Sequence, residues 1–223
     1  NKVIELADAE GSAVTATVTA STDEISAVTV GVDISASSSN HTIDVAIGEA
    51  TADEITAINT LAAQDGIGVI SGALGSRNGE DPLTQVQAAL LDTDTDDTFT
   101  IKTQALSVSA AATLTTKTDG ALTIANLTGE LSTYVSGTTL VNDLQTVIST
   151  VDGLDISITD SNGLDAETQL DSLNALADYS DSSNSQVLGD ITVTIAGDVD
   201  ELTNTSTNAS LLSTGTSDPV TIT

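Results

Sequence analysis

The densest run of chemically capable side chains lies in the middle of the chain, where aspartates alternate with threonines at Asp92, Asp94 and Asp96 and continue to Asp97. Carboxylate oxygens are ligands that Ca²⁺ prefers, and acids at alternate positions are typical of the start of a calcium-binding loop. A complete loop of this kind needs Gly after the third acid and Glu at its end. Asp97 takes the Gly position, and no Glu follows in place. These four aspartates are the candidate calcium ligands, and a solvated acidic loop is the alternative.

Two further acidic groups lie in expected turns. If turns from successive repeats stack, their acids meet and repel unless a cation bridges them. The alternative is that they are ordinary turn residues and helix caps. The two groups are Asp152, Asp155 and Asp160, and Asp198, Asp200 and Glu201.

Catalytic motifs are sparse. A Ser-His-Asp triad would have to use His41, the only histidine, which follows a polar turn and lies in no nucleophile elbow. A carboxylate pair suits glycoside hydrolysis, but sugar platforms rely on aromatic side chains, and the chain has only Phe99, Tyr134 and Tyr179. The sequence predicts a protein that is not an enzyme, with a polysaccharide-active enzyme as the last alternative.

Charge narrows the classes of partner. Thirty-three acidic residues and four basic ones give a formal net charge of -29. This field repels the phosphates of nucleic acid and anionic membrane surfaces, while dissolved cations screen it. No stretch is long and apolar enough to span a bilayer. We expect no nucleic acid partner and no membrane insertion.

The core must be built from small aliphatic residues, because Met, Cys and Trp are absent. Such a core suits thin, regular layers stacked on one another. A strand-like alternation followed by an acidic helix start recurs along the chain, most clearly from Val14, Ile43 and Ile191, and more loosely from Leu122 and Ile156. The recurrence predicts a repeat array. Its approximate units are 14–42, 43–80, 81–121, 122–155, 156–190 and 191–223.

Amphipathic helices are expected at 165–177, 51–63 and 140–148, where apolar residues recur every three or four positions. A shorter helix is expected at 83–91, opened by Asp81 and Pro82 as cap and first turn. From Phe99 to Ile124, Thr and Ala alternate without a helical period, and we expect strands only. Together these patterns predict an α/β solenoid of short parallel strands and short helices, with all-β sandwich modules as the alternative.

The units also carry a resemblance. Two parts of the chain resemble repeats in very large acidic surface proteins of marine bacteria, particularly cyanobacteria. One is the alternating strand at 191–194 with the acidic turn and helix start at 200–202, and the other is the segment 173–178 that follows 156–160. The resemblance implies a surface layer, fibre or adhesin, often linked to calcium. The Gly-Gly-x-Gly-x-Asp calcium repeat of many such proteins is absent from this chain.

The predicted function is that of an extracellular, cell-surface structural or adhesive protein that self-associates into a surface layer, fibre or sheath. Calcium is the one candidate cofactor, and a cell-surface polysaccharide is a candidate partner. A viral fibre or receptor-binding segment is the alternative, because trimeric fibres also favour Thr, Ser, Ala and Gly. The missing initial Met and the strand-like end at 219–223 predict an excerpt of a longer chain.

Overall fold

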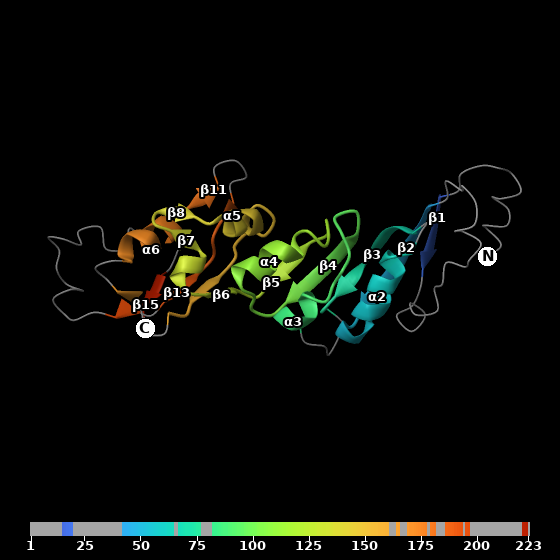
Figure 1. The fold of residues 1–223 in the computed structure, drawn as a ribbon, viewed down its shortest axis with the longest axis horizontal. Coiled ribbons are helices and arrows are strands. Elements are labelled where there is room, and N and C mark those ends of the chain that lie inside the picture. Colours follow the sequence, from blue (N-terminus) through green and yellow to red (C-terminus); the bar gives the residue numbers. More distant parts are fainter. Residues whose placement is uncertain are drawn as a thin grey trace, which may run out of the picture. The chain divides into compact units, whose positions relative to one another are not determined.

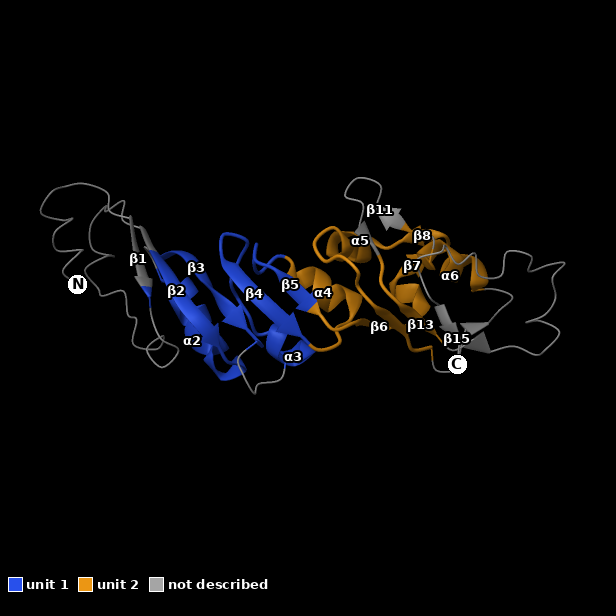
Figure 2. Cartoon of the chain, turned by 180° about the vertical axis from the view of Figure 1, so that it is seen from behind, with its two compact units in different colours: residues 1–103, 116–123 blue, residues 104–115, 124–223 orange. Residues whose placement is uncertain are grey.

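The computed structural model describes residues 15–19, 42–64, 67–76, 82–160, 164–165, 169–177, 179–181, 186–193, 195–196 and 220–222. They form mixed α and β structure with parallel sheets (Figure 1). The chain divides into two compact units (Figure 2). Unit 1 comprises Asn1–Thr103 and Thr116–Thr123, and unit 2 comprises Gln104–Thr115 and Ile124–Thr223. His41, Asp198, Asp200 and Glu201 lie outside the described residues.

In unit 1 the described strands lie side by side in chain order. They are β1 (Thr15–Thr19), β2 (Thr42–Ala50), β3 (Ile67–Leu74), β4 (Thr98–Thr103) and β5 (Leu122–Ile124). The pairs from β1 to β4 are parallel, and β5 joins β4 through a hydrogen bond from Ile101 N to Ala121 O. Parallel neighbours need a crossover, and short helices occupy two of these crossovers: α2 (Ile55–Ala62) and α3 (Gln85–Ala88).

Local sequence explains these elements. In β4, side chains alternate between exposed and buried, and Phe99 and Ile101 enter the core as fully buried residues. In α2, Ile55, Ile58 and Leu61 recur every three residues and are also buried, so one helix face packs toward the sheet (Figure 1). The core of unit 1 therefore lies between a single sheet and the short helices that pack against it.

Unit 2 repeats this scheme with shorter strands. The sheet holds β6 (Leu127–Gly129), β9 (Ile156–Ile158), β13 (Ile191–Val193) and β15 (Val220–Ile222), all parallel and in chain order. Ile156 lies opposite Ile191, and these are two of the positions at which the sequence predicted successive repeat starts. The helices are α4 (Val108–Leu114), α5 (Asn142–Ile148) and α6 (Leu170–Ala177).

Smaller elements complete the described parts. Two short 3-10 helices are η2 (Ala52–Glu54) and η3 (Leu131–Thr133). In unit 2, β7 (Val135–Ser136) pairs antiparallel with β8 (Thr139–Leu140), and β11 (Ser180–Asp181) with β12 (Gln186–Val187). β10 (Leu164–Asp165) pairs parallel with β14 (Ile195–Ala196). Among the described residues, no helix combines the length and apolar character required to cross a bilayer.

The expected helices are present, with corrected starts. The prediction at 51–63 matches η2 and α2, and the prediction at 140–148 matches α5, which begins after β8. The helix expected at 165–177 is α6, but Asp165 belongs to β10. The helix expected at 83–91 is the shorter α3, and its cap is Thr84 instead of Asp81. Thr84 Oγ1 accepts from Gln87 N at 3.3 Å while Gln87 Oε1 accepts from Thr84 N at 2.9 Å, which forms a capping box.

The prediction that 99–124 holds only strands was wrong, because α4 lies inside it. Its buried residues Val108, Ala111 and Leu114 recur every three positions, and its alanines favour helix. Ser107 caps the helix by accepting a hydrogen bond from Ala110 N at 3.3 Å. The alternation of Thr and Ala around it masked both signals.

Replacing Ser107 with Ala should lower the stability of unit 2 by about 1 kcal/mol, because the first turn of α4 loses its side-chain acceptor. The measurement is the free energy of unfolding in urea. Ser136→Ala, at an exposed position of β7 in the same unit, is the control and should change little. Equal effects of the two substitutions would show that the cap is not what stabilises α4.

Candidate functional site

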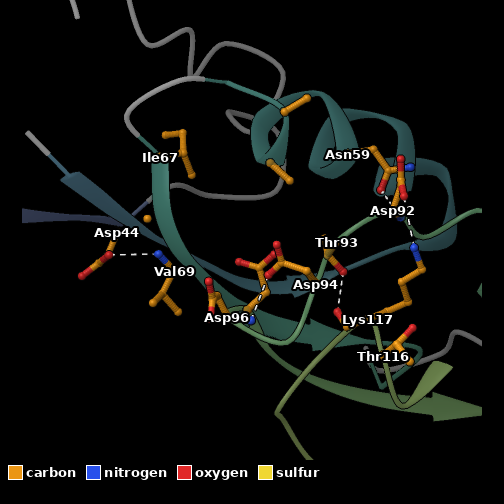
Figure 3. A pocket seen from close by; sticks show the side chains of 14 residues that line it. Asp44, Asn59, Ile67, Val69, Asp92, Thr93, Asp94, Asp96, Thr116 and Lys117 are labelled. Atoms are coloured by element: carbon orange, nitrogen blue, oxygen red, sulfur yellow. Dashed lines mark hydrogen bonds and ion pairs between the residues drawn. The ribbon is translucent and has the colours of Figure 1, made fainter. Parts of the chain in front are cut away.

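An acidic hollow of about 740 Å³ lies in unit 1 (Figure 3). The C-terminal end of α2, the beginning of β3, the loop of residues 92–97 and the turn at 116–117 line it. The parallel order of β2, β3 and β4 brings these segments together, although they are far apart in sequence. Its acidic lining comprises Asp44, Asp92, Asp94, Asp96 and Asp97. The four aspartates singled out from the sequence thus share one hollow.

Asp92 lies at the exposed edge of the hollow, next to the cation Lys117. Lys117 Nζ lies 3.1 Å from Asp92 Oδ1, and the Asp92 side chain is 82% exposed. Asn59 of α2 fixes the backbone there, since its Oδ1 accepts from Asp92 N at 2.8 Å and its Nδ2 donates to Leu90 O at 2.7 Å. An exposed ion pair contributes little to stability. The two bonds of Asn59 therefore position this end of the loop.

Asp94 and Asp96 form the middle of the loop, and both side chains are exposed. Asp94 Oδ1 accepts a hydrogen bond from Asp96 N at 2.8 Å. A carboxylate that accepts from the backbone two residues later forms a tight local turn. The turn exposes both carboxylates to solvent.

Asp97 is the buried member, with 5% exposure. Its Oδ1 accepts from Ile70 N in β3 at 2.7 Å, and its backbone O accepts from Asp119 N at 2.8 Å and from the Thr118 hydroxyl at 3.1 Å. Burial raises the pKa of Asp97 above its usual value, against the lowering effect of hydrogen bonds from the Ile70 and Asp94 amides. Asp97 thus connects β3, the acidic loop and the turn that contains Thr118 and Asp119.

Lowering the pH from roughly 7 to 4 should stabilise unit 1 through Asp97. Because its pKa is higher in the folded protein than in the unfolded chain, its contribution is fully present below the unfolded value of about 3.9 and is lost as the pH rises through the folded value. Asp97→Asn removes the titrating group and keeps an acceptor for Ile70 N. Thermal unfolding across this pH range should therefore depend less on pH in Asp97→Asn than in the parent.

Asp96→Asn is the control for that experiment, because Asp96 is adjacent but exposed. It reports the effect of removing one negative charge from the same loop. If Asp96→Asn flattens the pH dependence as much as Asp97→Asn, general charge repulsion explains the effect, and burial of Asp97 does not.

The calcium hypothesis for Asp92, Asp94, Asp96 and Asp97 stays a prediction. The hollow collects their carboxylates, but each has a different environment: an ion pair, a local turn, solvent and a buried backbone contact. Within the described residues, no group of three or more His, Asp or Glu side chains has an arrangement that could hold a metal ion.

The lining residues that sequence reasoning missed include Asp44, Asn59 and Lys117. Asp44 lies in β2, apart from Asp92 in Figure 3, and its Oδ1 accepts from Val69 N at 3.0 Å. Lys117 carried a usable signal, since it is one of only four basic residues in a chain of charge -29. A rare cation in such a chain is a candidate partner for a carboxylate, and Lys117 pairs with Asp92.

The acidic turns of unit 2 play a related part. Asp155 Oδ1 accepts from Asp190 N at 2.8 Å, 35 residues away, and Asp160 Oδ2 accepts from Leu131 N at 2.9 Å, 29 residues away. With Asp44 and Asp97 they form a set that we call the inter-segment acceptors: carboxylates that bind a backbone N–H 25 to 35 residues distant. This use favours the interpretation of these acids as structural turn residues.

Comparisons of the chain with protein-family models, with curated proteins and with solved structures give no match.

Proposed function

We propose that the chain is a structural or adhesive segment of an extracellular assembly, such as a surface layer, fibre or sheath. The observation that carries the proposal is that strands β1 to β4 of unit 1 and strands β6, β9, β13 and β15 of unit 2 are parallel neighbours in chain order. A chain that adds one strand per crossover builds a surface by repetition and does not depend on a single enclosed site.

We further propose that these crossovers are coils of an α/β solenoid. The register supports this: Thr15 lies opposite Thr42 and Ser71 opposite Thr98, each 27 residues on. In unit 2 the steps are 29 residues from Leu127 to Ile156, 35 from Ile156 to Ile191 and 29 from Ile191 to Val220. Steps of this size are typical of stacked structural repeats.

The inter-segment acceptors support the same proposal. In a stack of coils, some backbone amides find no acceptor in the strand pairing, and these amides need an acceptor from elsewhere. Carboxylates from the neighbouring segment supply them to Val69, Ile70, Leu131 and Asp190. Part of the acidity is then a means of joining one coil to the next, and the exposed remainder is available to cations.

This function requires that copies of the chain associate with one another, and we propose that calcium promotes this self-association. Molecules with a formal charge of -29 repel one another in low salt. Divalent cations that bridge exposed carboxylates, such as those of Asp94 and Asp96, would lower this repulsion.

The experiment is light scattering and electron microscopy of the whole chain, first with millimolar calcium and then with a chelator. We expect calcium to convert monomers into filaments or sheets and the chelator to reverse the change. Monomers under both conditions, and also at high protein concentration, would contradict self-assembly. Assembly that persists in the chelator would support the structural function and would contradict a role for calcium in it.

A charge-matched pair of variants separates the acidic loop from general charge. Asp94→Asn with Asp96→Asn removes two exposed carboxylates from the hollow, whereas Asp143→Asn with Asp171→Asn removes two exposed carboxylates from α5 and α6. Loss of the calcium response only in the first variant would assign bridging to the loop. An equal shift in both would assign it to diffuse screening.

A further inference from the structure

We draw no further inference here: the strongest candidate, the acidic hollow of unit 1 between the end of α2 and the 92–97 loop, is a cluster of acidic side chains with no second feature among the described residues that points to a ligand.

Discussion

Gly120→Ala is expected to destabilise unit 1 by about 3 kcal/mol or more. A Cβ at this position would collide with the backbone carbonyl of Phe99 and lie 2.8 Å from Phe99 N. The neighbour is the backbone of β4, a paired strand whose Phe99 side chain is fully buried, so it cannot move aside as a flexible side chain would. Gly120 therefore allows the turn at 118–120 to lie directly against the sheet.

The measurement is the free energy of unfolding in urea, with circular dichroism to follow loss of structure. Gly48→Ala is the matched control in the same unit, because Gly48 has φ +65° but nothing lies within 4 Å of the position that a Cβ would take there. Its cost should be only the left-handed backbone term, about 1–2 kcal/mol. A cost for Gly120→Ala no larger than that of Gly48→Ala would show that the turn does not pack against Phe99 this closely.

Tyr134→Ala should cost unit 2 about 3–5 kcal/mol, because it removes a large, fully buried side chain and leaves a cavity. Tyr134 follows η3, and its hydroxyl lies close to the space that a Cβ on Gly129 would occupy. The absence of a side chain at Gly129 in β6 leaves room for the ring. Tyr134 is thus a centre of packing in a core that has few aromatic residues.

Tyr134→Phe separates the ring from its hydroxyl and should act in the opposite direction. The buried hydroxyl has no hydrogen-bond partner among the described residues, and an unsatisfied buried polar group costs free energy. Its removal should stabilise unit 2 by about 1 kcal/mol. Destabilisation by Tyr134→Phe would mean that the hydroxyl has a partner, such as an ordered water, and that it contributes to stability.

The coarse fold was predictable because its signals are local. Alternating β-branched residues predicted the strands, and apolar spacing of three or four residues predicted α2, α5 and α6. Boundaries were less predictable. Thr84 caps α3 in place of Asp81 because Gln87 completes its capping box, and the helix expected from Asp165 begins at Leu170. Local capping geometry decides such ends, and several residues nearby are chemically suitable for it.

Strand pairing was harder to predict than strand existence. Leu122 and Ile156 were both predicted from the sequence as successive repeat starts. On the side of β9 that faces the preceding strand, however, Ile156 lies opposite Leu127, and Leu122 belongs to β5 at the end of the sheet in unit 1. Two short apolar runs five residues apart are indistinguishable by composition. Packing of the surrounding helices and turns decides which sheet each one joins.

The acidic hollow was likewise predictable in part: its local features could be predicted from the sequence, and its long-range contacts could not. The run from Asp92 to Asp97 was visible in the sequence, but the burial of Asp97 and the pairing of Asp92 with Lys117 depend on segments more than 20 residues away. One-dimensional spacing shows that carboxylates are close along the chain. It does not show which of them a neighbouring strand will cover.

The inter-segment acceptors have a consequence for local opening of the chain. Backbone amides in short or irregular segments normally open locally and exchange their protons with solvent quickly. The amides of Ile70, Leu131 and Asp190 are instead held by side chains from segments 27, 29 and 35 residues distant. Their hydrogen-exchange rates are therefore governed by the separation of neighbouring segments. The exchange rate of each amide then reports how often the two segments that its hydrogen bond joins come apart.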